Sequence, residues 1–141
     1  MATDDPTAIR TLAVTTDDVV AALEANERRD ASAVLRVTPP FSGRMRARLH
    51  LAGTEHEYDE PKPLHLPPEA FVDSAPEFPT ADRTEDALRS HPDRTYAPET
   101  HREYHERAVA AWRRAVRDSL RETTTIEAPG GPHEVDLAML G

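Results

Sequence analysis

The sequence predicts an α+β fold in which a mostly antiparallel sheet packs on one long helix in the C-terminal half. Several short stretches alternate between apolar and polar residues, which is the period of a half-buried strand. Residues 98–122 instead repeat their apolar side chains with the period of a helix. At 141 residues the chain has the length of one domain. We expect residues 1–141 to form that domain, with residues 61–97 as a proline-rich loop region.

The first elements follow from alternation and from a capping signal. Residues 9–15 alternate and predict a strand. A helix follows, capped by Thr15 or Thr16, and ends near Arg28. Residues 31–38 alternate again and predict a second strand, with its apolar side chains on one face.

Residues 44–51, RMRARLHL, predict a third strand with a basic face and an apolar face. Residues 54–60 predict the next strand of the same meander. A two-residue turn between them places Arg48 opposite Asp59, which pairs base with acid. The apolar side chains of the third strand are expected to face the core.

Proline dominates the middle of the chain. Eight of the 13 prolines lie between residues 61 and 98. Proline removes backbone donors and interrupts regular ladders, so we expect irregular coil with one short helix at residues 80–90. Such a long loop either covers the surface of the domain or carries function.

Residues 98–122 give the strongest helical signal. Proline suits the first turn, at position 98, and Thr100 with Glu103 matches a capping box. Glutamates come early and arginines late, which is the order that the helix dipole favours. The remaining residues predict a hairpin that turns at Gly130-Gly131.

The composition is acidic and almost free of lysine. The formal net charge is −9, Lys62 is the single lysine, and there is no cysteine. In this composition the chain resembles small uncharacterised haloarchaeal proteins, which implies a salt-adapted cytoplasm. Without cysteine there is no disulfide or thiolate chemistry. The first ten residues are acidic where a signal peptide would be basic and then apolar, and no apolar run approaches a membrane span. We therefore expect a cytoplasmic protein that needs no cofactor.

One stretch departs from this acidic character. Residues 31–54 contain no aspartate or glutamate, yet they hold several arginines. Arg36, Arg44 and Arg46 lie near the turn between two predicted strands, beyond the reach of the acidic row on residues 54–60. We expect them to meet a carboxylate of this chain, a phosphate, or an acidic partner. Only Phe41 lies close enough for base stacking, which weakens a nucleic-acid role.

The long helix offers a second candidate surface. Its apolar side is wider than a sheet would cover, and the residues concerned are Val109, Trp112, Val116 and Leu120. If they are exposed, they form a face for a homodimer or another partner. The alternative is that the sheet covers one side of the helix and the proline-rich segment the other.

Two histidines invite a metal hypothesis that the sequence does not complete. His101 and His105 are one helical turn apart, a spacing that suits two zinc ligands. No third ligand follows, so we expect no metal and interpret these histidines as packed side chains. No nucleophile, phosphate-binding or dinucleotide motif is present. An enzyme would need polar groups from the loop and the helix to converge in one pocket.

We therefore predict a non-catalytic binding or adaptor protein that acts through protein contacts, with an unknown protein partner or a homodimer. The residues expected to carry it are Arg36, Arg44 and Arg46. Binding of nucleic acid or another phosphate anion through the same arginines is the alternative, and a small enzyme is the third. Salt dependence distinguishes the protein-binding function from the nucleic-acid function. Phosphate binding weakens steeply as the salt concentration rises, whereas contacts that bury apolar surface become stronger.

Overall fold

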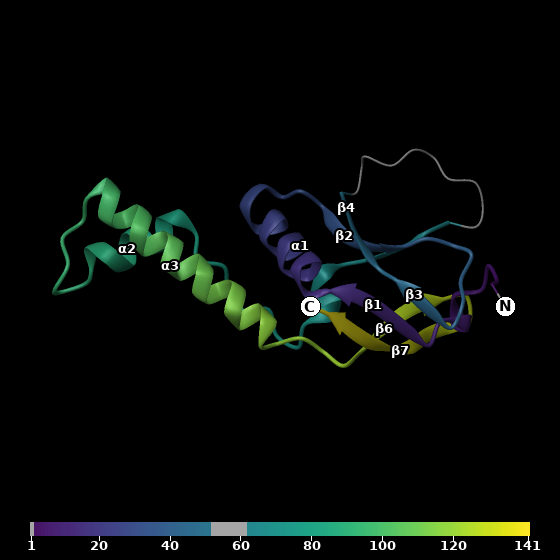
Figure 1. Cartoon of the computed structure of the whole chain (residues 1–141). Coiled ribbons are helices and arrows are strands. Elements are labelled where there is room, and N and C mark those ends of the chain that lie inside the picture. Colours follow the sequence, from purple (N-terminus) through teal and green to yellow (C-terminus); the bar gives the residue numbers. More distant parts are fainter. Residues whose placement is uncertain (1, 52–61) are drawn as a thin grey trace.

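A computed structural model describes residues 2–51 and 62–141 of the chain, and it confirms an α+β fold (Figure 1). The helices are α1 (Thr16–Arg29), α2 (Ala81–Arg89) and α3 (Pro98–Arg117), and short 3-10 turns cover Pro6–Ala8 and Pro68–Phe71. The strands are β1 (Thr11–Thr15), β2 (Ala33–Val37), β3 (Arg44–Arg46), β4 (Arg48–Leu51), β5 (Leu64–Leu66), β6 (Thr123–Ala128) and β7 (Gly131–Leu140). The strand expected at residues 54–60 lies outside the described residues.

The described strands form two sheets instead of the single sheet expected. One has the order β3-β1-β7-β6, and the other has the order β4-β2-β5. In the first sheet β1 runs parallel to both β3 and β7, while β6 and β7 form the predicted antiparallel hairpin. The second sheet is antiparallel throughout. Alternation along a strand shows which side chains share a face, but it does not show which strands pair.

The expected strand at residues 44–51 is divided between the two sheets. Its first part, β3, pairs with β1, and its second part, β4, pairs with β2. Ala47 lies at the division, fully buried, and its N–H donates to the carbonyl oxygen of Ala13 at 2.9 Å. A strand that passes from one sheet to another makes a corner between them. Ala47 is small enough to be enclosed at that corner.

The proline-rich segment contributes to the core. Leu66, Phe71, Val72 and Phe78 are buried in the same apolar cluster as the strands of both sheets and α1. The segment also supplies β5 between two prolines, which the sequence did not predict. The expectation of a surface coil is therefore wrong for this part of the chain. The short helix predicted at residues 80–90 is present as α2, capped by Thr80.

The helix α1 begins and ends through local side-chain bonds. The Thr15 hydroxyl accepts a hydrogen bond from the N–H of Asp18 at 3.1 Å, the predicted N-cap. At the other end, Asp30 adopts a left-handed conformation with φ 48°. The side chain of Asn26 then binds both the N–H and the carbonyl oxygen of Ala33, at 2.6 and 3.0 Å. These bonds fix the entry into β2.

The helix α3 begins at the predicted proline, but with a different cap and a different end. Ala97 is the N-cap residue, and its N–H donates to the Thr100 hydroxyl at 2.9 Å, so Thr100 lies inside the helix. The helix ends at Arg117, several residues earlier than expected. There the chain turns so that Leu120 forms an antiparallel bridge with Val72.

The packing of α3 also differs from the expectation. It lies beside α1 and α2, and Figure 1 shows α2 and α3 at one end of the molecule, extending away from the sheets. Ion pairs join Arg113 to Glu24 and Arg117 to Asp17, both on α1. The long helix therefore rests on other helices and on the proline-rich segment. Within the described ranges, no helix combines the length and the apolar character needed to cross a membrane.

Candidate functional site

The structure separates the three arginines that the sequence grouped. Arg44 and Arg46 lie on β3, the edge strand of the four-stranded sheet. Arg36 lies on β2 in the other sheet, with Arg48 as its cross-strand partner on one side and His65 on the other. Like charges are thus juxtaposed on neighbouring strands, and the cross-strand partner of Arg36 is Arg48 and not Arg44.

Arg44, Arg46 and Arg48 follow one another at every second residue of one continuous stretch of chain, on either side of the corner at Ala47. We call these three residues the basic strand surface. None of the three forms an ion pair within residues 2–51 and 62–141. The Nε of Arg46 is buried and has no hydrogen-bond partner among the described residues. A buried donor left in this state costs about 1–3 kcal/mol.

Two leucines adjoin the basic strand surface. Leu49 and Leu51 lie on β4 on the face opposite to Arg48, which the sequence assigned to the core, yet 40% and 39% of their surfaces are exposed. The N–H of Leu49 donates to the Asp18 carboxylate at 3.3 Å, which places β4 beside the start of α1. The strand therefore presents arginine on one side and apolar surface on the other.

An aromatic pair lies on the outer face of the three-stranded sheet. The rings of His50 and His65 stack with centroids 5.4 Å apart, next to Arg36 and Arg48. Phe41, the residue expected to be available for base stacking, is buried instead. The histidine pair could not be predicted from the sequence, because His50 and His65 lie on two different strands, β4 and β5, which flank β2.

The apolar side of α3 is covered within the chain. Val109, Trp112 and Val116 are buried, and Leu120 is half-buried in its bridge to Val72. The indole N–H of Trp112 donates to the carbonyl oxygen of Pro76 at 3.0 Å. The ring of Phe78 meets the indole edge-on, with centroids 5.0 Å apart. The hypothesis of an exposed interaction face on this helix is wrong, because the proline-rich segment fills it.

The two histidines of α3 converge on a threonine of α2. The buried hydroxyl of Thr84 lies 2.8 Å from Nε2 of His101 and 3.0 Å from Nδ1 of His105. It also donates to the carbonyl oxygen of Ala81 at 3.1 Å. No cluster of three or more metal-ligating side chains occurs within the described residues. Sequence reasoning missed Thr84, because only the packing of α2 on α3 brings it to the histidines.

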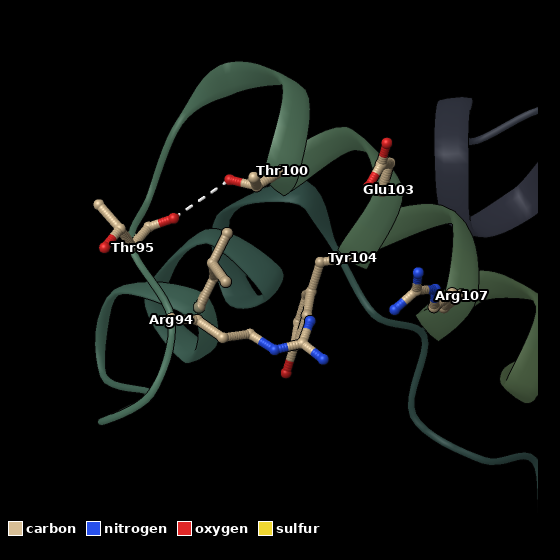
Figure 2. A pocket seen from close by; sticks show the side chains of 7 residues that line it. Arg94, Thr95, Thr100, Glu103, Tyr104 and Arg107 are labelled. Atoms are coloured by element: carbon tan, nitrogen blue, oxygen red, sulfur yellow. Dashed lines mark hydrogen bonds between the residues drawn. The ribbon is translucent and has the colours of Figure 1, made fainter.

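The surface of the α2–α3 unit contains cavities lined by charged residues. One of about 340 Å³ lies at the start of α3, with Arg94, Tyr104 and Arg107 among its lining residues (Figure 2). The guanidinium carbon of Arg94 is 5.8 Å from the centroid of the Tyr104 ring. A second cavity of the same volume lies where α3 meets the end of α1. These volumes fall at the small end of the range for small-molecule sites.

The whole chain, residues 1–141, matches the family described as Domain of unknown function (DUF8009). The protein belongs to this family. No curated protein and no solved structure matches the chain.

Proposed function

We propose that this DUF8009 protein is a non-catalytic adaptor that binds an acidic segment of a partner protein along the basic strand surface. The observation that carries the proposal is the buried Nε of Arg46, which has no hydrogen-bond partner among the described residues. Arg46 as a whole is half-buried, so a partner carboxylate would reach the outer part of its guanidinium and draw Nε into a charge-assisted bond, which is stronger than a neutral one.

The charges around Arg46 favour the same partner. Arg44 and Arg48 form no ion pair with any described residue, although the chain carries 26 acidic residues. An extended acidic segment lying along the strand would meet all three guanidinium groups in turn. Their spacing of two residues matches the spacing of side chains on one face of an extended chain.

The exposed leucines favour protein over nucleic acid. Leu49 and Leu51 add exposed apolar area on the opposite face of the edge strand that carries Arg48. A partner that covers this edge would meet both faces, and stable protein interfaces combine an apolar centre with arginine. Apolar contact also keeps its strength in concentrated salt, which screens exposed charges. The proposal therefore suits the salt-adapted cytoplasm that the composition suggests.

One observation favours nucleic acid as a second candidate. The stacked rings of His50 and His65 lie beside arginine on one sheet face, and single-stranded nucleic acids bind platforms that combine stacking rings with basic side chains. Binding of this kind should fall steeply as salt rises.

Fluorescence anisotropy separates the two candidates. The probes are a labelled peptide of glutamate and leucine and a labelled single-stranded oligonucleotide, each titrated from low to multi-molar KCl. The test variant is Arg44→Ala/Arg46→Ala/Arg48→Ala. The control, Arg29→Ala/Arg83→Ala/Arg114→Ala, changes the net charge equally at exposed positions elsewhere. Circular dichroism checks that every variant is folded at each salt concentration.

Peptide binding that survives high salt, disappears in the test variant and persists in the control would support the adaptor. Binding of the oligonucleotide alone, with the same dependence on the three arginines, would replace the adaptor with the nucleic-acid function. If the folded parent binds neither probe, or if both triple variants lose binding equally, the basic strand surface is not a binding site.

A further inference from the structure

We propose a second site, for a phosphate group, in the cavity between the end of α1 and the middle of α3. The cavity has a volume of about 340 Å³ and is lined by Arg28, Arg102, His105, Glu106, Val109 and Arg113. It lies on the helical part of the molecule and includes no residue of the basic strand surface. The inference is independent of the adaptor function.

Two of the arginines are held in place before any ligand arrives. Glu24 accepts from Nε of Arg28 at 2.8 Å, and from Nε and Nη2 of Arg113 at 2.7 and 2.9 Å. The guanidinium of Arg28 also lies 5.7 Å from the ring centroid of Phe78. Guanidinium groups fixed in this way lose little side-chain entropy when they bind an anion.

The third arginine, Arg102, adds a further positive charge to the cavity. Arg102 is exposed and forms no ion pair or hydrogen bond with any described residue. The cavity is lined by three arginines and one carboxylate, Glu106, while Glu24, which is not among the lining residues, binds Arg28 and Arg113. Its positive excess favours an anion.

His105 gives the site its preference for a phosphate group. The Thr84 hydroxyl donates to the Ala81 carbonyl oxygen, and with its proton there the Thr84 oxygen accepts from Nδ1–H of His105 and from Nε2–H of His101. In the neutral ring Nε2 then carries the lone pair, and no described residue forms a hydrogen bond with it. Nε2 can therefore take a proton from solvent when a dianion binds beside it.

The surroundings disfavour the protonated form of His105 in the free protein. Desolvation lowers the pKa of its imidazole most, followed by the charges of His101 and Arg28, while Glu106 raises it. A bound phosphate dianion would offset the influence of Arg28 and raise the pKa again. Ligand binding and protonation of His105 are therefore coupled, and each strengthens the other. A carboxylate carries a single charge and would couple more weakly.

The coupling is measured by NMR titration of the His105 ring, assigned by comparison with His105→Gln. The probes are inorganic phosphate, and sulfate, which stays dianionic throughout the titration. Chloride at equal ionic strength is the reference. We expect phosphate and sulfate to raise the pKa of His105 in a saturable way, and chloride to leave it unchanged.

Arg102→Gln tests the site without disturbing the Glu24 bonds. We expect it to weaken phosphate binding about tenfold, the loss of one charge-assisted hydrogen bond. Arg114→Gln, an exposed residue of the same helix outside the cavity, should leave binding unchanged. An equal response to chloride, or equal effects of the two substitutions, would overturn the proposal.

Discussion

Arg113 of α3 donates two hydrogen bonds to the carboxylate of Glu24 on α1, at 2.7 and 2.9 Å. The same carboxylate accepts from Arg28, one turn further along α1. Glu24 therefore ties the long helix to the helix that packs beneath the sheets. Its side chain is only 17% exposed, while that of Arg113 is 44% exposed.

The bond between Arg113 and Glu24 makes the stability of the folded state depend on pH. The hydrogen bond from Arg113 lowers the pKa of Glu24 below its ordinary value of 4.5. The folded state therefore releases the proton more readily than the unfolded state. The stabilisation is complete above the ordinary pKa and is lost as pH falls through the lowered one.

We expect Glu24→Gln to cost about 1 kcal/mol at neutral pH, the scale of a well-formed but partly exposed ion pair. Urea denaturation at neutral and acidic pH measures the difference. A cycle with Arg113→Gln isolates the pair from the bond to Arg28. A cost that is the same at both pH values would show that the ionised pair does not form.

Trp112→Phe tests whether the apolar side of α3 is part of the core. The substitution removes the donor to the Pro76 carbonyl oxygen and part of the contact with Phe78. We expect a loss of about 1–3 kcal/mol in the free energy of unfolding. Arg114→Ala, on the exposed side of the same helix, should change it by less than about 0.5 kcal/mol. If both substitutions change the free energy of unfolding by similarly small amounts, the apolar side of α3 is exposed and not part of the core.

Asp30→Gly should stabilise the protein. Asp30 has φ 48° at the end of α1, a conformation that costs a residue with a side chain about 1–2 kcal/mol. Glycine relieves this strain but loses more entropy on folding, so a net gain of about 0.5–1 kcal/mol is expected. Arg29→Gly, one residue earlier within the helix, should instead cost about 1 kcal/mol. Thermal denaturation of the two variants should therefore show opposite shifts.

We expect His105 to make a second contribution to the pH dependence of stability. The lowered pKa of its imidazole means that the unfolded state binds more protons as pH falls below the ordinary value of 6.5. Stability should decline with falling pH from that point until the folded-state pKa is passed. Chemical denaturation across this range, compared with His105→Gln, measures the contribution. If the slope is unchanged in the variant, His105 does not titrate differently in the two states.

Much of the local structure could be predicted from the sequence. The Thr15 cap, the start of α3 at Pro98 and the hairpin of β6 and β7 each depend on neighbouring residues. Each signal combines a capping or turn residue with a clear apolar period. Such local preferences act whatever the rest of the chain does.

Long-range pairing could not be predicted in the same way. Nothing in RMRARLHL marks Ala47 as a corner, because a strand that changes sheets keeps its alternation. The parallel pairing of β1 with β7 joins the two ends of the chain. Likewise, the sequence around Trp112 is compatible with packing against a sheet or against the proline-rich segment. Only the tertiary packing shows which of the two covers this side chain. The candidate site could be predicted only in part. The sequence indicates the arginines, but it does not show that they lie in two different sheets.

The most direct test of the adaptor proposal is the side-chain Nε–H resonance of Arg46 in a ¹H–¹⁵N spectrum, assigned by its loss in Arg46→Lys. We expect the peptide of glutamate and leucine to shift this resonance in a saturable way, because its carboxylate supplies the missing acceptor. The Nε–H of Arg113, already bonded to Glu24, should not move. If the Arg46 resonance does not shift when the peptide is in excess, the basic strand surface does not bind the acidic segment and the adaptor proposal is wrong.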